Sequence, residues 1–353
     1  AIINKTPPED LPPKGHFHYH QGVFLLGMEY VYKISKEEKY FEYIKKWVDS
    51  LIYEDGCIAN YISDELDDIQ PGMLLFDLYD KTGEDKYKIA LKHLASLIKG
   101  WKTNGEGGFW HKGNTPNQMW LDGIYMGGPF AVKYGQLFND PSYFDLIYHQ
   151  ITVMKNRMRD EKTGLFYHGW DYSKQADWAN PETGLSSEFW GRAIGWYVMA
   201  LLDIEECLPT EDHRRQEIID IEIDLIKSLI DYQDKQSGIW YQVVDKPEKK
   251  DNWVEVSCSS LYVYAICKAI RKGYLDQTFM IYAQKGYHGV IDRLGYDHNG
   301  TLLVKDVCIG TGISNYDYYI NRPTSVNDLH GLGALILMCC EYGCLFEEME
   351  EAI

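Results

Sequence analysis

The sequence lacks the short motifs that mark most metal-dependent, nucleotide-binding and serine-nucleophile enzymes. Its eight cysteines form no CxxC and no cysteine–histidine pair at zinc spacing, and HExxH and GxSxG are both absent. The stretch GTGISNYDYY at 310–319 contains glycines but not a full GxGxxG motif. We therefore interpret 310–319 as a loop, and we expect neither a metal nor a cofactor.

Basic residues are too few for a protein that binds nucleic acid or an anionic membrane. Lys and Arg number 35 against 53 Asp and Glu, which gives a net charge of −18. This balance still allows a small anionic ligand, because such a ligand needs only a local cationic pocket. The composition leaves the oligomeric state open.

Long apolar runs are also missing, since no stretch approaches the roughly 18 residues of a membrane span. The opening AIINKTPPEDLPPKG has no signal-like apolar core, although a leader removed before this point remains open. The scattered cysteines suit a reducing compartment. We therefore expect a cytoplasmic protein.

Aromatic residues, in contrast, are abundant. They make up 14% of the chain, with 28 Tyr and 10 Trp, and hydrophobic residues make up 45%. This composition supports a large core. Tyr and Trp also line sites that stack on sugar-like faces, so part of this aromatic content could belong to a binding site.

A loose repeat organises the chain into one domain that spans 1–353. A glycine precedes a short apolar or aromatic segment five times, at Gly56, Gly108, Gly164, Gly238 and Gly300. Each segment is followed by a polar loop, an acidic residue, an apolar helix rich in small residues and, in most units, an amphipathic helix. Helices that are apolar all round are buried on both sides, so the pattern predicts an inner and an outer layer.

Six such helix pairs predict an all-α fold, an (α/α)6 barrel with short strand-like segments at its mouth. The opening unit, HYHQGVFLLGMEYVYKISKEEKYFEYIKKWVDSLI, has the pair without a preceding strand, and the C-terminal LFEEMEEAI would complete the last pair. An open α-solenoid is the alternative. We favour closure because every strand-like segment leads into the N-terminal end of an inner helix, so these ends would meet at one mouth.

Acidic residues stand where the predicted inner helices begin. They are Asp67 or Asp68, Asp122, Glu188, Glu255 and Asp328. Each could simply cap its helix and interact with the helix dipole, which is worth about 0.3–1 kcal/mol. Asp122 differs because QMWLDGIYMGGPF surrounds it with apolar residues, and such surroundings favour a protonated carboxyl group.

Other side chains capable of chemistry lie in the same loops. His111 and His168 occupy equivalent places in FWHKG and FYHGW, and WGRAIGW contains Trp190, Arg192 and Trp196. Trp rings stack on sugars, and Arg pairs with carboxylates. The alternatives are solvated histidines, tryptophans in the core and an arginine bound to a neighbouring acid.

Seven motifs occur in order along nearly the whole chain: HYHQGVFL, LDDIQPG, FWHK, MWLDGIYMGGPF, HGWDYSK, WGRAIGW and RPTSVNDLHGLGALIL. Together they resemble the unsaturated rhamnogalacturonyl hydrolases of glycoside hydrolase family 105. The resemblance implies an (α/α)6 barrel that removes an unsaturated uronic acid from the end of a pectin fragment left by a lyase. The implied partner is thus a small anionic oligosaccharide.

The resemblance also implies roles for individual residues. Asp122 is implied as the catalytic acid/base and Asp67 as the acid that assists it, although LDDIQPG leaves Asp68 as the alternative. The residues expected around the substrate are Tyr19, His111, Lys112, Trp120, His168, Trp190, Arg192 and Trp196.

The implied reaction would suit the surroundings of Asp122. An enol ether is hydrated by protonating C4 and adding water at C5, which needs a carboxylic acid that is protonated near neutral pH. Apolar neighbours and a second carboxylate are expected to raise the Asp122 pKa. The candidates for holding the uronate are Arg192, Lys112 and His168.

Three other functions fit parts of the pattern. An unsaturated glucuronyl hydrolase would act on glycosaminoglycan-type disaccharides. A conventional inverting glycosidase would use two carboxylates roughly 6.5–9.5 Å apart. A sugar-binding protein without activity would keep the aromatic residues but would have no need of Asp122. The leaving sugar and the substrate length are not indicated by the sequence.

Overall fold

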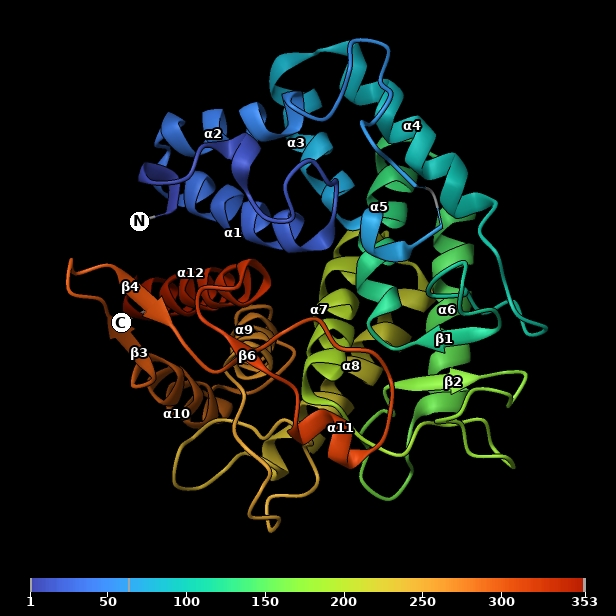
Figure 1. Ribbon diagram of the computed structural model, residues 1–353, viewed down its shortest axis with the longest axis vertical. Helices are drawn as coiled ribbons and strands as arrows, with labels where there is room; N and C mark the ends of the chain where they lie inside the picture. Colours follow the sequence, from blue (N-terminus) through green and yellow to red (C-terminus); the bar gives the residue numbers. More distant parts are fainter. Residues whose placement is uncertain (1, 63, 352–353) are drawn as a thin grey trace.

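The computed structural model describes residues 2–62 and 64–351. In this part of the chain, six helices form a closed inner ring (Figure 1). They are α1 (Tyr19–Ser35), α3 (Leu74–Thr82), α5 (Gly123–Phe138), α7 (Gly191–Cys207), α9 (Val256–Arg271) and α12 (Leu329–Glu351). Most of these helices are apolar nearly all round because both of their faces are covered, whereas the short α3 exposes Asp80 and Lys81. In α9, for example, every residue from Val256 to Ile270 is buried.

The outer helices are amphipathic and cover the ring from outside. They are α2 (Glu38–Asp49), α4 (Asp85–Lys99), α6 (Ser142–Met158), α8 (His213–Asp231) and α10 (Met280–Ile291). In α4, the buried positions Ala90, Leu91, Leu94 and Ile98 repeat at helical spacing, and Lys92 between them faces solvent. Each outer helix packs against the inner helix that precedes it in the chain.

The last pair differs from the prediction. The segment LFEEMEEAI does not turn back as a separate helix, because its described residues, up to 351, continue α12. The part of the chain that the structure describes therefore has five outer helices for six inner ones. The turn glycine that the prediction needed is absent between Leu345 and Glu351, so nothing in the sequence interrupts the helix there.

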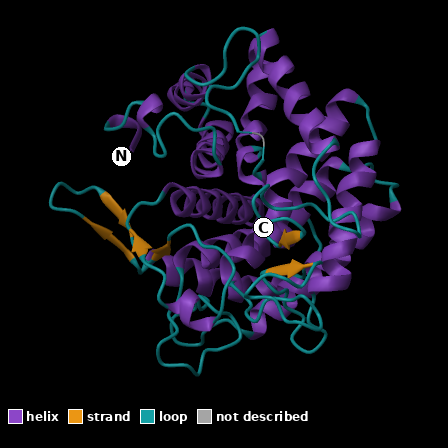
Figure 2. Ribbon diagram, turned by 45° about the vertical axis from the view of Figure 1, so that its right-hand side comes forward, coloured by secondary structure: helices purple, strands orange, loops and turns teal. Residues whose placement is uncertain are grey.

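Short strands join the helices on one side of the barrel (Figure 2). They are β1 (Gln118–Trp120), β2 (Gly169–Asp171), β3 (Leu294–Tyr296), β4 (Leu302–Val304), β5 (Val307–Cys308) and β6 (Thr324–Ser325), and they form three antiparallel pairs. Four of the five repeat glycines have positive φ, as their turns require. In the second unit this role belongs to Gly107, with φ +78°, rather than to Gly108.

The contact between α1 and α12 closes the ring and excludes an open solenoid. At this contact the two backbones come so close that only glycine fits. A Cβ on Gly333 would lie 2.6 Å from the backbone carbonyl carbon of Val23, and one on Gly27 would lie 3.3 Å from the carbonyl oxygen of Gly333. α12 alone, among the described helices, has the length and composition to cross a membrane. Most of it is buried between α1 and α9, so its apolar character belongs to the core.

Ion pairs fill the end of the barrel where the inner helices finish. Lys268 of α9 is 1% exposed and binds Asp203 and Glu206 of α7 at 3.0 and 3.1 Å. Arg271 of α9 pairs with Glu341 of α12 at 2.6 Å. Similar pairs link α1, α3 and α5 through Lys33, Asp77 and Lys133. The Lys268 and Glu341 side chains are each 1% exposed, so the loss of a partner would leave either charge buried and uncompensated. The pairs formed by Lys33, Asp77 and Lys133 are partly exposed and contribute less.

The α1–α12 contact generates a stability prediction. We expect Gly333→Ala to lower the free energy of unfolding by about 1–3 kcal/mol, because the added methyl group must push the two backbones apart. Gly343→Ala is the matched control on the same helix, since a Cβ there meets no atom of the described residues within 4 Å. Alanine should stabilise that position by up to about 1 kcal/mol. Thermal unfolding followed by circular dichroism tests both variants, and equal shifts in Tm would contradict the packing argument.

Candidate active site

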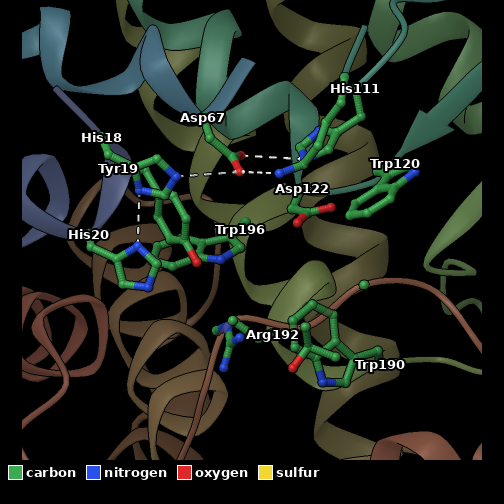
Figure 3. Close-up of a pocket in the computed structure, with 14 residues that line it drawn as sticks. His18, Tyr19, His20, Asp67, His111, Trp120, Asp122, Trp190, Arg192 and Trp196 are labelled. Atoms are coloured by element: carbon green, nitrogen blue, oxygen red, sulfur yellow. Dashed lines mark hydrogen bonds and ion pairs between the residues drawn. The ribbon is translucent and has the colours of Figure 1, made fainter. Parts of the chain in front are cut away.

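A cavity of about 400 Å³ opens where the N-terminal ends of the inner helices meet (Figure 3). Its wall contains every predicted site residue except His168. Those residues are Tyr19, Asp67, His111, Lys112, Trp120, Asp122, Trp190, Arg192 and Trp196. The wall also contains His18 and His20, which flank Tyr19, and Gly310, Thr311 and Gly312.

Asp122 reaches the cavity because β1 and β2 pair just before α5 begins. Trp120 lies opposite Gly169 in this pair, and the Leu121 amide donates to the His168 carbonyl oxygen at 2.8 Å. Asp122 then occupies the position before the first helical residue of α5, and its side chain is buried. Its carboxylate nevertheless bonds none of the helix amides in the described structure. The helix therefore does not account for this acid.

The other acids at helix starts have different partners. Glu255 is a true cap of α9, because it accepts a hydrogen bond from the Cys258 amide at 2.6 Å. It also accepts one from the Cys308 amide at 2.8 Å, which anchors the 308–312 segment. Glu188 pairs with Lys246. The capping interpretation thus holds for Glu255, whereas Asp122 remains available for another role.

The charge state of Asp122 differs from the sequence expectation. Burial disfavours its carboxylate, but the imidazoles of His168 and His111 close to it outweigh burial and lower the pKa to about 2. His168 Nε2 lies 3.6 Å from Asp122 Oδ1. The prediction that Asp122 is protonated is therefore wrong, because nothing in the order of the residues indicates that an imidazole lies directly behind it.

Asp67 faces the cavity between two histidines and a lysine (Figure 3). Its carboxylate lies 3.4 Å from His111 Nε2, 3.2 Å from Lys112 Nζ and 3.9 Å from His18 Nε2. Although burial opposes ionisation, the charges of His111 and Lys112 keep the Asp67 pKa below its usual range. The structure thus offers an ionised Asp67 on the same wall as Asp122.

Asp68 is placed differently from its neighbour. It is not among the described residues that line the cavity. Burial, followed by the negative charges of Asp67 and Glu65, raises the pKa of Asp68 to about 8. Of the two candidates in LDDIQPG, Asp67 is the acid that faces the cavity.

Aromatic rings line both sides of this pair of acids. Trp120 is half-buried and stacks on His111 with ring centroids 4.4 Å apart and an interplanar angle of 12°. Trp196 stacks on Tyr125 at 4.7 Å. Trp190 and Trp196 are each 1% exposed and belong to the core beneath the cavity, as the alternative interpretation expected. Trp120 keeps part of its ring exposed, where a sugar ring could stack.

Arg192 is 1% exposed and carries a charge that the described carboxylates do not pair with. Its two terminal nitrogens donate to the carbonyl oxygens of Cys308 and Ile309 at 2.6 and 2.7 Å, and its Nε has no described partner. The guanidinium lies over the Trp190 ring at 4.5 Å. Arg192 thus holds the 308–312 segment at the edge of the cavity, and the alternative of a bond to a neighbouring acid is wrong.

His168 is the one predicted site residue that does not line the cavity. Its ring is fully buried, and its Nε2 faces Asp122 rather than the open space. The structure thus places His168 next to Asp122, and its contact with a substrate stays a prediction. The motif FYHGW resembles FWHKG, but β2 pairing turns its histidine behind the acid.

Four residues near the cavity form what we call the histidine cluster: His18, His20, Asp328 and His330. Of these, His18 and His20 line the cavity. His18 Nδ1 and His20 Nδ1 are 3.0 Å apart, and His330 Nδ1 lies 2.7 Å from Asp328 Oδ1. His20, Asp328 and His330 have the composition of a metal site, as do His18, Glu65 and Asp67. The charge of Arg192 faces His20 and His330 and opposes a cation there. The expectation of no metal stays a prediction.

The segment 308–325 was only partly anticipated. It contains α11 (Tyr316–Ile320), so the interpretation of 310–319 as a loop was wrong for its second half. Gly310, Thr311 and Gly312 at its start were missed as cavity residues. The available signal was the glycine pair, which exposes backbone that can approach a ligand closely.

Comparisons with known proteins give a consistent answer. The model of Glycosyl Hydrolase Family 88 matches residues 1–346. The unsaturated rhamnogalacturonyl hydrolase YesR of Bacillus subtilis strain 168 is 29% identical over 312 residues, which cover 86% of this chain and 82% of YesR.

Solved structures agree with the fold along almost the whole chain. A glycoside hydrolase from family 105 of C. acetobutylicum ATCC 824 is 39% identical, with a TM-score of 0.91 and 97% of each chain covered. A possible member of family 105 from Salmonella enterica serovar Paratyphi A is 24% identical, with a TM-score of 0.82, and covers 95% of this chain and 84% of its own. At the latter identity the likeness is one of fold.

The histidine cluster generates a prediction about pH and stability. Burial, then the charges of His330 and His18, lower the pKa of His20 from 6.5 to about 3. The unfolded chain therefore binds a proton below pH 6.5 that the folded chain refuses until about pH 3, so stability falls as pH falls through this range. We expect His20→Gln to reduce the loss of unfolding free energy between pH 7 and pH 4 by up to about 1.4 kcal/mol per pH unit. Tm should therefore decrease less steeply over this range in the variant than in the wild type.

The control for this experiment is His298→Gln, which removes an exposed imidazole from the β3–β4 turn. Its Tm should follow the wild-type dependence on pH. Parallel curves for wild type and His20→Gln over this range would show that His20 takes up its proton equally in both states.

Proposed function

The chain belongs to Glycosyl Hydrolase Family 88, and from this premise we propose that it hydrates the C4–C5 double bond of a terminal unsaturated uronic acid. The substrates are oligosaccharides that a pectin lyase leaves from rhamnogalacturonan. Family membership confirms the predicted resemblance and the class of glycoside hydrolase. The relative YesR, named an unsaturated rhamnogalacturonyl hydrolase, supports this substrate.

One observation supports the mechanism above the others. Asp122 is a buried carboxylate that lines the cavity, caps no amide of α5 among the described residues, and has Asp67 on the same wall. A buried acid without a structural task is typical of a catalytic group. Trp120 beside it offers the flat surface on which a sugar ring can stack.

The proposed reaction proceeds by hydration rather than by direct cleavage. A proton is added to C4, and water then adds its oxygen to C5 while giving up a proton. The C5 hemiketal opens to a ketone, which leaves a hemiacetal at C1. This hemiacetal collapses to an aldehyde and releases the remaining saccharide as an alcohol. One carboxyl group can serve both proton transfers, because it donates first and accepts second.

We assign both proton transfers to Asp122. To donate the first proton, its carboxyl group must be protonated when the substrate is bound. Its pKa is about 2, so it is ionised at neutral pH. Binding a uronate brings a second negative charge and displaces water, and both effects raise a carboxyl pKa. The acid is thus prepared by the substrate itself. Asp67 stays ionised beside His111 and Lys112, where it can stabilise positive charge that develops on the sugar.

The uronate carboxylate is assigned to Arg192. Lys112 is already engaged by Glu65 and Asp67 at 2.9 and 3.2 Å. Arg192 bonds only neutral carbonyl groups among the described residues, so its charge is free to balance a ligand carboxylate. Among the described residues, Arg192 is thus the cation of the cavity wall that is not bonded to a carboxylate.

A cytoplasmic location and a small-molecule partner complete the proposal. All eight cysteines lie in the described part of the chain, and all are free thiols. This supports a reducing compartment.

Replacement of Asp122 tests the catalytic assignment. We expect Asp122→Asn to reduce the rate of ultraviolet absorbance loss from an unsaturated rhamnogalacturonan disaccharide by about 10²–10⁴-fold, because the amide can neither donate nor accept the required proton. Asp68→Asn is the matched control, since Asp68 lies outside the cavity and its raised pKa makes the amide a close mimic. Retention of most activity by Asp122→Asn would disprove the assignment.

A substrate panel separates this function from its alternatives. Wild-type protein is incubated with unsaturated disaccharides from pectin and from glycosaminoglycans, and with saturated pectin oligosaccharides. Preference for the first group supports the proposal. Preference for the second indicates a glucuronyl hydrolase, cleavage of the third a conventional inverting glycosidase, and binding without turnover a sugar-binding protein.

The condition on Asp122 predicts that binding takes up a proton. A saturated uronyl-rhamnose analogue carries the same carboxylate but cannot react. At pH 6 its binding should take up a fraction of a proton that approaches one, since free Asp122 is ionised and bound Asp122 is protonated. Calorimetry in two buffers of different ionisation enthalpy measures this number. Asp122→Asn should abolish the uptake, and a wild-type value of zero would refute the preparation of the acid by substrate.

A further inference from the structure

His168 stands behind Asp122 with both ring nitrogens committed to different neighbours. Nε2 faces Asp122 Oδ1 at 3.6 Å, and Nδ1 lies 2.7 Å from the Tyr319 hydroxyl. The His168 and Tyr319 side chains are both fully buried. Water therefore does not decide which nitrogen carries the proton, and the protein groups around the ring must do so.

The hydrogen bonds of Tyr319 indicate the answer. Its hydroxyl oxygen accepts a hydrogen bond from the Ser314 amide at 3.3 Å. An amide can only donate, so the hydroxyl hydrogen is free to point elsewhere, and His168 Nδ1 is the acceptor within reach. A neutral imidazole that accepts at Nδ1 carries its hydrogen on Nε2. That hydrogen then points at the Asp122 carboxylate.

We propose that Tyr319 is a positioning residue that holds His168 in the Nε2–H tautomer and thereby directs a hydrogen-bond donor at Asp122. The other tautomer would place a nitrogen lone pair against the carboxylate, which is repulsive. Tyr319 does not line the cavity and touches no substrate. Its importance for catalysis rests on the proposed function of Asp122, whereas the tautomer itself does not.

The fold holds the Tyr319 hydroxyl rigidly in this position. Gln242 Nε2 donates to the Tyr319 carbonyl oxygen at 3.1 Å, and the Tyr319 ring stacks on Trp190 with centroids 6.0 Å apart. Asn315 caps α11 through the Tyr318 amide at 3.0 Å. Gln242, Trp190 and the capped helix α11 therefore fix the position of the hydroxyl group that His168 contacts.

The same chain segment also forms the edge of the cavity. The 310–312 stretch lines the opening, and Arg192 binds the carbonyl groups of Cys308 and Ile309 just before it. Tyr319 lies seven residues beyond Gly312. The segment thus connects the outer edge of the site, which a substrate contacts, with the inner face of its catalytic acid.

The test uses Tyr319→Phe in the full-length protein. Phenylalanine keeps the ring that packs on Trp190 and removes only the hydroxyl. We expect kcat to fall about tenfold, the effect of one hydrogen bond, and KM to change by less than about twofold. Tyr316→Phe is the matched control on the same helix, because the Tyr316 hydroxyl bonds the exposed Asp251 at 2.8 Å.

Nitrogen-15 NMR of histidine-labelled protein reads the tautomer directly and needs no substrate. The His168 signals are identified by their loss in His168→Gln. In wild type and in Tyr316→Phe, His168 should show a protonated Nε2 and an accepting Nδ1. In Tyr319→Phe the signals should shift toward a mixture of both tautomers.

Two results would overturn the proposal. One is a protonated Nδ1 in the wild-type protein, which remains measurable even if Tyr319→Phe does not fold. The other is an unchanged His168 tautomer in a folded Tyr319→Phe. A tautomer shift without loss of activity would instead support the positioning role and contradict the assigned role of Asp122.

Discussion

The close packing of α1 against α12 is the constraint on which the rest of the structure depends. Because Gly333 has no side chain, the backbones of the first and last inner helices can come into direct contact. Because this contact closes the ring, the starts of all six inner helices face one opening. Residues as far apart in the sequence as Tyr19 and His330 therefore belong to one site, with ring centroids 6.1 Å apart.

Within that opening, the acids and histidines set one another's charge. Asp122 and Asp67 are buried, yet both are held ionised, because imidazoles and a lysine lie beside them. An apolar sequence neighbourhood therefore did not produce a protonated acid. In this arrangement the negative charges of the two acids are balanced by the histidines and the lysine beside them. A ligand with its own negative charge disturbs that balance, and the disturbance falls on the residue that the mechanism needs to change.

Much of the fold followed from periodicity, since helices that are buried on both sides must be apolar all round, and those on the outside must be amphipathic. Part of the cavity wall could also be predicted from the sequence. Asp67 and Asp122 stand at the starts of predicted inner helices, and Lys112 lies in a predicted loop that leads to one. The features that the sequence did not predict depend on tertiary contacts. Glu255 and Asp122 look alike in sequence, but one caps a helix and the other does not. Only the β1–β2 pairing shows that His168 lies behind an acid.

The ion pairs at the far end of the barrel have a consequence for how a polymer can be degraded. Lys268 and Arg271, with their acidic partners, fill the space where the inner helices finish, so in the described structure the cavity is a blind pocket rather than a tunnel. A polysaccharide cannot thread through a blind pocket. Its tip alone can enter, and the shortened chain must withdraw by the route it came. Under the proposed reaction each oligosaccharide therefore loses a single sugar, because its new end carries no C4–C5 double bond to hydrate.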